Sequence, residues 1–397
     1  MQKKAYAVCG GGLIGLLLAK TLADSGVSVV VYMDKTPQKK PNNPMVYALN
    51  AASINLLKRL NLLHLIYANP VKLMHVCDQQ HDFSWEFSHK KINQPAIAYI
   101  VRSGELYDAL HKICVADNNI EIITAKLLKL VNNDDFGVIV SDEFNNEKTY
   151  GWLFAADGKS SWLREQLFVD SCWLSEHSQI AIITTIKLAK NMENTAWQKF
   201  LKSGPIAFLP RDDGYFGVIW SVEQELGKKL LGQNNADFAR SLVEVSGGDF
   251  GQIKIMADRY SIELVSQYAK KLYKGRCVLV GDAARVILPL FGQGANLGCL
   301  DILAIEDIIN RFDQQSLPNN SLGVLYQQAR HLDGLLIGKL AELINHNTCW
   351  QNNIMAEFRG LLGKSALSNN YLQQVLLQYA LGQRSFVEQA AFTWPDY

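Results

Sequence analysis

Two spacings of hydrophobic residues alternate along this chain, and the changes between them predict its elements. Apolar runs at residues 5–9 and 27–32 flank a stretch with helical spacing at 16–23. This order predicts a strand, a helix and a second strand. Far along the chain, residues 278–280 predict a buried strand, and the apolar positions from Ala295 onward predict a helix. Both ends of this span therefore favour α/β structure.

The middle of the chain favours strands. Residues 179–265 are rich in β-branched and aromatic side chains, with one helical pattern near 236–245. The predicted strands are 180–188, 205–210, 216–222 and 253–264. Asp212-Asp213-Gly214, between two of these runs, has the composition of a hairpin turn. We therefore expect a β-rich domain inserted into an α/β frame.

A glycine motif begins directly after the first predicted strand. Residues 10–15 follow the pattern G-x-G-x-x-G, and the predicted helix begins there. Glycines at this place let the backbone approach a pyrophosphate at the helix N-terminus, as in dinucleotide-binding units. Four glycines in this stretch also argue against a signal peptide, so we expect a cytoplasmic protein.

The second strand of such a unit normally ends in an acidic residue that binds the adenosine ribose. The spacing places Met33 there and Asp34 one residue later. A shift of one residue turns a side chain to the other face of a strand. Asp34 therefore reaches the ribose only where the strand ends or bulges, and we assign this role to Asp34 on that condition.

A second ligand-binding segment lies between residues 278 and 301. Its strand ends at Gly281-Asp282, and Pro289 and Gly292-Gln293-Gly294 follow. The Asp282 carboxylate can accept hydrogen bonds from hydroxyl groups, and a helix N-terminus offers free N–H groups. The segment predicts a ligand that carries sugar hydroxyls together with phosphate or carbonyl oxygens.

A third motif lies at residues 153–164. Its predicted strand ends at Asp157-Gly158, and Ser160 or Ser161 is expected to cap a helix that carries Arg164. Alone, Asp-Gly is a common turn. Together with the two glycine segments it supports one extended cofactor site.

Composition and charge exclude several classes of function. The 39 basic and 38 acidic residues give a net charge of +1, which provides no electrostatic basis for nucleic-acid binding. Seven cysteines without C-x-x-C predict neither a disulfide framework nor a zinc site. His75, Cys77 and His81 have no familiar ligand spacing, so we expect no metal. No apolar run reaches membrane-spanning length.

These motifs, in order along most of the chain, resemble the FAD-dependent aromatic hydroxylases of p-hydroxybenzoate hydroxylase fold, and among them the ubiquinone-biosynthesis hydroxylases. The matching segments are 10–15, 101–106, 156–164, 196–200, 204–210, 219–221 and 281–301. Trp197-Gln198-Lys199-Phe200 and residues 204–210 favour the quinone-pathway branch. The resemblance implies an α/β fold with a Rossmann-like FAD-binding domain, a β-rich substrate domain and C-terminal helices.

The resemblance also implies where the domains and the site lie. The FAD-binding domain would be discontinuous, with residues 1–75, 95–175 and 266–320; the substrate domain would hold 76–94 and 176–265, and the C-terminal helical region 321–397. FAD would contact Gly10, Gly12, Leu13, Ile14, Gly15, Asp34, Arg102, Asp157, Asp282, Gly292, Gln293, Gly294, Ala295 and Asn296. Pro289 and Arg285 would lie beside the flavin, and Phe208, Leu209, Pro210 and Trp220 would line the substrate pocket.

The chemistry implied by the resemblance belongs mainly to the cofactor. NAD(P)H, as a transient co-substrate, would reduce the flavin, and O2 would then form a hydroperoxide that hydroxylates a polyprenyl phenol. No side chain of this chain is assigned as a catalytic acid or base. The protein would exclude water and orient the ring.

Three residues depart from the family pattern. Met33, Met45 and Arg285 stand where the family usually has an acid, an arginine and a histidine. Losing two polar FAD contacts would cost a few kcal/mol and weaken FAD binding. One alternative is therefore a cofactor-poor paralogue that serves as a structural subunit of a quinone-biosynthesis complex. An NAD-dependent dehydrogenase is a third alternative, but no acid–base constellation for it is evident.

The last part of the chain has a helical stripe. Its members are Leu372, Val375, Leu376 and Tyr379. Such a stripe is most often core packing. The alternatives are a subunit contact, in a homo-oligomer or a larger complex, and a peripheral contact with the inner membrane, where a polyprenyl substrate resides.

Overall fold

The N-terminal strand lies in the middle of a parallel sheet. The computed structural model describes residues 5–34, 43–79, 83–168, 172–190, 192–289, 292–315 and 321–349. The sheet order is β19-β20-β12-β1-β2-β8, with β1 (Tyr6–Cys9), β2 (Val29–Met33), β8 (Ile120–Thr124), β12 (Leu153–Ala155), β19 (Tyr273–Lys274) and β20 (Cys277–Leu279). All neighbours are parallel except β19 and β20. The carboxyl ends of β1, β12 and β20 therefore meet at one edge, where α/β sheets bind ligands.

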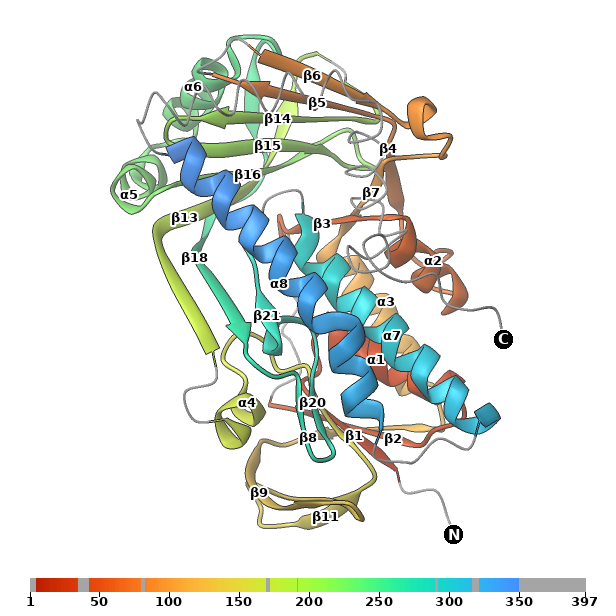
Figure 1. Ribbon diagram of the computed structural model, residues 1–397. Helices are drawn as coiled ribbons and strands as arrows, with labels where there is room; N and C mark the ends of the chain where they lie inside the picture. The colour runs from red at the N-terminus through yellow and green to blue at the C-terminus, as the bar shows by residue number, and fades with distance from the viewer. Residues whose placement is uncertain are drawn as a thin grey trace.

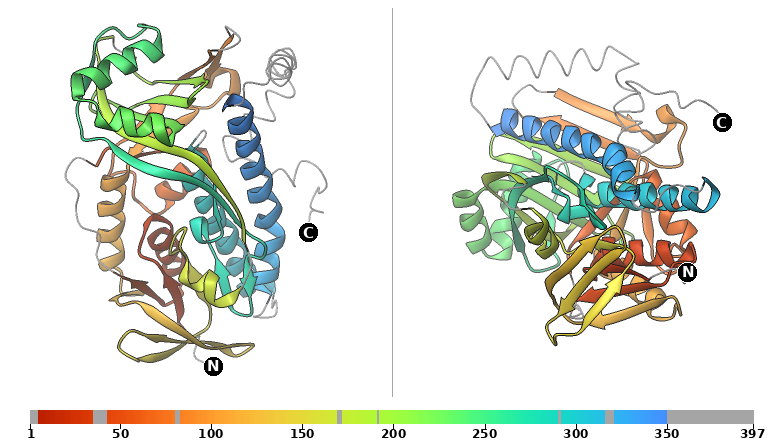
Figure 2. Two further views of the ribbon diagram at one scale, coloured as in Figure 1. Left: turned by 90° about the vertical axis from the view of Figure 1, so that its left-hand side faces the viewer. Right: turned by 60° about the horizontal axis from the view of Figure 1, so that its bottom comes forward.

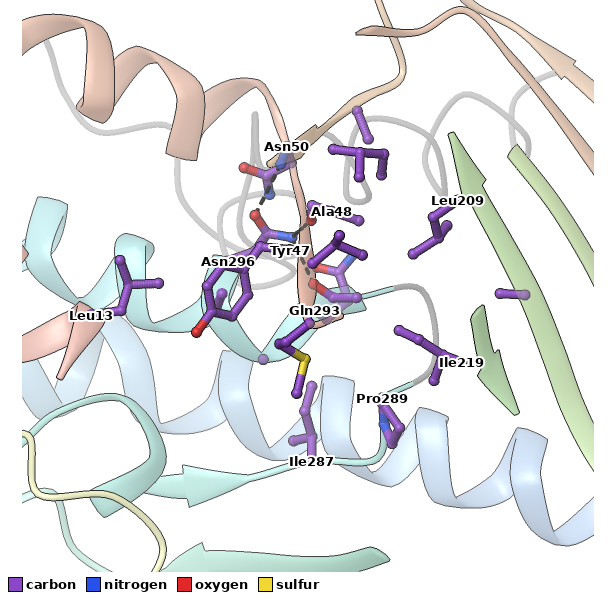
Figure 3. Close-up of a pocket in the computed structure, with 18 of the residues that line it drawn as sticks. Leu13, Tyr47, Ala48, Asn50, Leu209, Ile219, Ile287, Pro289, Gln293 and Asn296 are labelled. Carbon is purple, nitrogen blue, oxygen red and sulfur yellow. Dashed lines mark hydrogen bonds between the residues drawn. The ribbon is translucent and has the colours of Figure 1, made fainter. Parts of the chain in front are cut away.

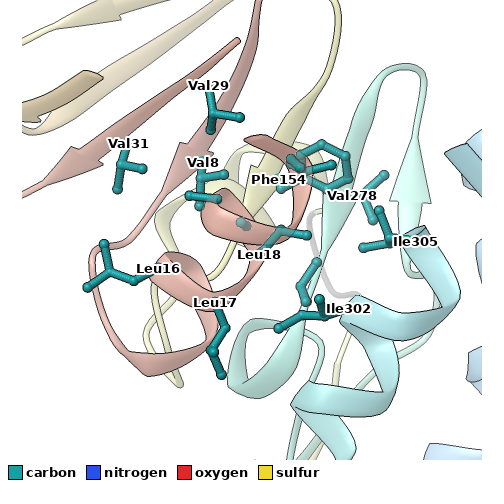
Figure 4. Close-up of a cluster of buried hydrophobic side chains, with 14 of the residues drawn as sticks. Val8, Leu16, Leu17, Leu18, Val29, Val31, Phe154, Val278, Ile302 and Ile305 are labelled. Atoms are coloured by element: carbon teal, nitrogen blue, oxygen red, sulfur yellow. The ribbon is translucent and has the colours of Figure 1, made fainter. Parts of the chain in front are cut away.

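Helices and a small meander cover this sheet. The helices α1 (Leu13–Asp24), α3 (Ser103–Val115) and α7 (Gln293–Gln315) lie side by side (Figure 1). Val8, Leu16, Phe154, Val278 and Ile302 belong to the core between strands and helices (Figure 4). The meander contains β9 (Leu127–Asp134), β10 (Gly137–Asp142) and β11 (Glu147–Tyr150). The sheet is thus buried on both faces, as its continuous apolar strands require.

A larger sheet follows the order β21-β18-β13-β16-β15-β14-β5-β6, with β17 paired to β13. Its strands are β5 (Leu73–Asp78), β6 (Phe83–Ser88), β13 (Cys172–Leu188), β14 (Thr195–Leu201), β15 (Gly204–Pro210), β16 (Phe216–Glu223), β17 (Ile253–Ile255), β18 (Tyr260–Ala269) and β21 (Arg285–Val286). The helices α5 (Gln224–Gly232) and α6 (Asn235–Ser246) pack on one face (Figure 2). The other face is turned toward the helices of the parallel sheet.

Smaller elements connect the two sheets. A three-stranded sheet has the order β3-β7-β4, with β3 (Val46–Leu49), β4 (Ala68–Val71) and β7 (Ala98–Arg102). The remaining short elements are α2 (Ala51–Arg59), which contacts β7; α4 (Trp162–Leu167), which contacts β9; and the 3-10 helices η1 (His89–Ile92), beside β6, and η2 (Gly281–Ala283), beside α7. The helix α8 (Leu322–Cys349) runs from the parallel sheet to the larger one (Figure 1). No helix in the described part of the chain is long and apolar enough to cross a membrane.

The predicted α/β fold class with a β-rich insertion is confirmed. The hairpin at Asp212-Asp213-Gly214 joins β15 to β16, with Gly214 at φ 74°. The single strand predicted over 253–264 is wrong, because the chain forms β17, leaves the sheet and returns as β18. The helix α5 was not predicted; it is only 9 residues long and contains Gly227. The domain boundaries stay a prediction, and the stripe of 372–379 lies outside the described residues.

Candidate active site

A cavity of ≈ 500 Å³ lies between the parallel sheet and the larger sheet. One side is formed by the N-termini of α1 and α7 and by the loop after β20. The opposite side is formed by one face of β14, β15 and β16, from which Leu209 and Ile219 point toward Pro289 and Gln293 (Figure 3). Most of the lining is apolar. The cavity therefore suits a ligand that meets backbone on one side and apolar side chains on the other.

The glycines of the motif have two roles: Gly10 and Gly15 permit close packing, and Gly12 leaves the backbone open to the cavity. A Cβ on Gly15 would lie 1.8 Å from the Gly10 carbonyl oxygen, and a Cβ on Gly10 would lie 2.3 Å from the Ala156 carbonyl oxygen. Both glycines therefore permit α1 to pack against β1 and β12. A Cβ on Gly12 would meet nothing within 4 Å, and Gly12, Leu13 and Ile14 line the cavity. Gly12 is also the N-cap of α1 without a side-chain cap, so the N–H groups of the first turn are available to an anion.

Asn296 braces the second glycine segment. Its Oδ1 accepts from the Asn50 backbone N–H at 2.9 Å and from the Ser53 hydroxyl at 2.8 Å. Its Nδ2 donates to the carbonyls of Ala48 at 2.9 Å and Gly292 at 3.0 Å. These bonds use the full capacity of the amide. Asn296 therefore fixes Gly292 against β3, while the first turn of α7 lines the cavity.

Two ionisable side chains, Asp282 and Tyr47, face the cavity. Asp282 is accessible through the cavity, yet burial within the surrounding protein raises its pKa, while the charge of Arg285 lowers it. Burial, together with the nearby Asp282, raises the pKa of Tyr47 to about 12. Tyr47 extends from β3 into the cavity (Figure 3). The Tyr47 phenol therefore stays protonated at neutral pH and can donate a hydrogen bond.

Asp157 follows β12 and lies behind the glycine motif. Burial raises its pKa, and its Oδ1 is buried without a hydrogen-bond partner. The other oxygen lies 3.7 Å from Cys9 Sγ. Ser161, one of the two predicted caps, accepts from the Arg164 N–H and begins α4. Asp157 does not line the cavity, whereas its neighbours Ala156 and Gly158 do.

The adenosine end of the predicted site differs from the expectation. Asp34 is exposed and forms an ion pair with Lys126 at 3.3 Å, so it turns away from the cavity. Met33 is buried, and its side chain packs over Gly11, where an added Cβ would lie 2.3 Å from Met33 Cε. The strand ends at Met33, but the side chain of Asp34 follows the strand alternation. No acid in the described residues takes the ribose position beside Gly11.

Arg102 and Arg285 also lie elsewhere than predicted. Arg102 forms ion pairs with Glu105 and with Asp212 at 3.0 Å and does not line the cavity. Arg285 lies on β21 with its side chain away from the cavity, whereas its neighbour Val286 lines it. Arg285 is buried against Asp301, with Nη2 at 2.8 Å from Oδ1. Arg285, which we expected beside the flavin, therefore does not line the cavity.

Asp301 is the centre of a buried charge network. It accepts from Arg285, from Arg330 Nε at 3.0 Å and from the Gly281 backbone N–H at 3.0 Å. Arg330 in turn pairs with Asp333 at 2.9 Å. The two arginines and two carboxylates balance in charge, which a buried network requires. The network thereby ties α8 to the turn that carries Asp282.

Only part of the predicted substrate wall lines the cavity. Leu209 does, but Phe208 and Trp220 are buried on the other face of the sheet with Phe238 and α6. Pro210 is not part of the lining, and its carbonyl accepts from Asn69. The reason is strand alternation, since residues 205, 207 and 209 share the cavity face. The same rule would have identified the lining residues that were missed, among them Gln198, Ile219 and Ser221.

Other lining residues carried no motif in the sequence. Tyr47, Asn50, Met74 and Ile287 reach the cavity from β3, the N-cap of α2, β5 and the loop after β21. The apolar spacing of β3 gave no indication that its aromatic residue would point at the site. Pro289 and Met45 also line the cavity; a place for Pro289 beside the flavin stays a prediction.

The comparisons with known proteins agree with this geometry. Residues 4–311 match the model of a family described as FAD binding domain. This chain belongs to that family. It is 26% identical over 398 residues to the 3-demethoxyubiquinol 3-hydroxylase of Escherichia coli K12, which covers 96% of this chain and 99% of the relative. It is 25% identical to the ubiquinone biosynthesis monooxygenase COQ6 of Drosophila melanogaster, over 74% of this chain and 71% of the relative.

Solved structures of this fold are more distant in sequence. The crystal structure of PqsL, a probable FAD-dependent monooxygenase from Pseudomonas aeruginosa, has a TM-score of 0.77 at 15% identity and covers 91% of this chain and 100% of that one. HpxO of Klebsiella pneumoniae, complexed with FAD and uric acid, has a TM-score of 0.73 at 16% identity, over 94% and 97% of the two chains. At this identity the likeness establishes the fold.

The residues of the cavity fit FAD. Bare backbone at Gly12 and the uncapped N-terminus of α1 suit a pyrophosphate. The Asp282 carboxylate suits the hydroxyls of a ribityl chain, and the first turn of α7 suits the carbonyl oxygens of a flavin ring. Among the described residues, no acid lies at the place expected for the adenosine ribose, which Met33 occupies.

Proposed function

We propose that this protein is an FAD-dependent aromatic-ring monooxygenase that hydroxylates a polyprenyl phenol intermediate of ubiquinone biosynthesis with NAD(P)H and O2. The observation that carries the proposal is a single cavity with two helix N-termini on one side and an apolar sheet face on the other. The names of the relatives support the substrate class.

The side chains and backbone of this protein would bind and enclose rather than react. When bound, FAD supplies the redox chemistry by which one oxygen atom of O2 reaches the ring. The N–H groups at Gly12 and Leu13 would bind the pyrophosphate, and Asp282 would accept from the ribityl hydroxyls. Pro289 and Leu209 would exclude water from the ring edge.

The alternative of a cofactor-poor structural subunit is not favoured. A scaffold has no need for a bare helix N-terminus that opens on a cavity, yet Gly12 lies there with free space around its α-carbon. The departures at Met33 and Met45 instead predict weak FAD binding. We also propose that the protein acts at the surface of the inner membrane, because a polyprenyl phenol partitions into lipid.

The test begins with purified protein and added FAD. We expect flavin absorbance to remain with the protein after gel filtration in excess FAD, and NADPH oxidation to accelerate with a short-chain prenylphenol. The expected product carries one additional hydroxyl group by mass spectrometry. Protein that binds no FAD at any concentration and oxidises no NADPH would contradict the proposal. Expression in hosts that each lack one ring-hydroxylation step would identify the ring position.

A further inference from the structure

The sheet side of the cavity contains two polar side chains in an apolar surface. Gln198 on β14 is in register with Ala207 on β15, which is in register with Ile219 on β16. Ser221 lies on the same face, two residues beyond Ile219. All four residues line the cavity, and their neighbours on this wall include Pro205 and Leu209. The two polar groups thus interrupt an otherwise apolar wall.

Both polar side chains are largely buried on the cavity wall. Gln198 is 5% exposed and Ser221 is 3% exposed. Neither side chain is among the fully enclosed polar groups that lack a partner, and neither forms a side-chain hydrogen bond with a described residue, so their polar atoms remain accessible from the cavity. Asn296 on the cofactor side, in contrast, uses all of its bonds. An amide or hydroxyl that is reached only from a cavity can bond to the molecule that occupies the cavity. A ligand that offers hydrogen-bonding groups at this wall can therefore bond to both side chains.

Charge along the cavity restricts that ligand. Among the described lining residues none is Lys, Arg or His, and Asp282 is the one ionisable carboxylate. A carboxylate on the ligand would thus find no cation on the sheet wall and would be repelled by Asp282. Hydroxyl and ether oxygens, in contrast, can both be satisfied by an amide and a hydroxyl.

We propose that Gln198 and Ser221 form a specificity subsite that binds the hydroxyl or ether oxygens of an uncharged aromatic ring and rejects its carboxylated counterpart. This inference rests on the proposed function for the identity of the ring. It assigns Gln198 and Ser221 to substrate orientation, since the groups that would bind FAD, at Gly12, Asp282 and the first turn of α7, lie on the other side of the cavity. Removing either side chain should reduce discrimination between oxygenated and unoxygenated rings while leaving FAD binding unchanged.

The experiment compares binding of three probes to the FAD-loaded full chain by calorimetry: 2-prenylphenol, prenylbenzene and 2-prenylbenzoate. We expect the wild type to bind the phenol about tenfold more tightly than prenylbenzene and to bind the benzoate least. Gln198→Met, which keeps the volume, and Ser221→Ala should each reduce the phenol preference about threefold or more. Gln224→Met, at an exposed glutamine on α5, is the matched control and should retain the full preference.

A second measurement separates substrate orientation from simple packing. In Gln198→Met the share of oxidised NADPH that yields hydroxylated product should fall, while the Kd for FAD and the melting temperature stay near wild type. Equal loss of affinity for 2-prenylphenol and prenylbenzene in Gln198→Met would overturn the subsite, and so would an unchanged phenol preference in both variants. If the wild type binds the probes but hydroxylates none, the proposed function fails while the binding comparison still decides the subsite.

Discussion

The two sides of the cavity differ in what lines them: mainly backbone on the cofactor side, and side chains on the sheet side. The cofactor side consists of backbone at Gly12 and at the first turn of α7, held by packing that only glycine permits. The sheet side consists of side chains whose direction depends on strand alternation, with Leu209 and Ile219 inward. The cofactor side therefore tolerates few residue types, whereas the sheet side can change its ligand by single substitutions.

The largest effect should come from β15, where neighbouring residues face opposite sides of the sheet. Phe208→Ala should lower the free energy of unfolding by about 3–5 kcal/mol, because Phe208 fills the core beneath α6. Leu209→Ala should cost less stability and should instead raise the KM for a prenylphenol. Urea denaturation and steady-state kinetics measure the two effects. Similar stability losses for both variants would contradict the assignment of the faces.

The glycine motif offers a matched pair on the cofactor side. Gly15→Ala places a Cβ 1.8 Å from the Gly10 carbonyl oxygen and should cost about 3 kcal/mol of unfolding free energy. Gly12→Ala adds a Cβ to open space and should stay within about 1 kcal/mol of wild type. Gly12→Ala should still weaken FAD binding in a fluorescence titration, because its methyl group enters the cavity. Normal FAD affinity in Gly12→Ala would remove the pyrophosphate from this place.

A substitution at Met33 should strengthen FAD binding. A glutamate at this strand end could accept from the adenosine ribose hydroxyls, so Met33→Glu should tighten FAD binding about tenfold, or about 1.4 kcal/mol. Met33→Leu is the control and should leave the Kd for FAD unchanged. Titration of the cofactor-free protein by flavin fluorescence quenching compares them. Equal dissociation constants for the two variants would show that the ribose does not bind at residue 33.

The smallest effect should come from the charge on Asp282. Burial raises its pKa, so ionisation is less favourable in the folded protein than in the unfolded chain. The cost to stability is absent below the unfolded pKa and grows as pH rises through the folded pKa. Asp282→Asn should therefore raise the melting temperature of the cofactor-free protein by a few degrees at neutral pH and leave it unchanged near about pH 3. A lower melting temperature at neutral pH would give the carboxylate a stabilising role instead.

The difference between the two sides also explains what could be predicted. Gly10, Gly15 and Gly292 could be assigned from sequence because close contact at their α-carbons excludes other residues. Phe208 and Leu209 could not be distinguished, because a shift of one residue in register exchanges the two faces. The fold class followed from the spacing of apolar residues, which does not depend on such a shift.

Arg285 shows a second reason why part of the site could not be predicted from neighbouring residues in the sequence. Its position next to Gly281-Asp282 suggested a place beside the ligand, but its partner Asp301 lies on α7, and Arg330, which shares Asp301, lies on α8. Gly334 makes room for it, since a Cβ there would lie 2.4 Å from Arg285 Nε. The direction of Arg285 is thus decided by contacts far along the chain.

The Asp301 network implies an order in which the cofactor side of the cavity forms during protein synthesis. The glycine motif leaves the ribosome first. The turn at Gly281 is held in place only after Asp301 has been synthesised and Arg330 on α8 has followed, because Asp301 bonds to both. A nascent chain that stops before α8 would contain every FAD-binding motif and still lack the support of Asp282. Newly made protein should therefore acquire its vitamin-derived cofactor only after α8 has left the ribosome, as a late step of maturation.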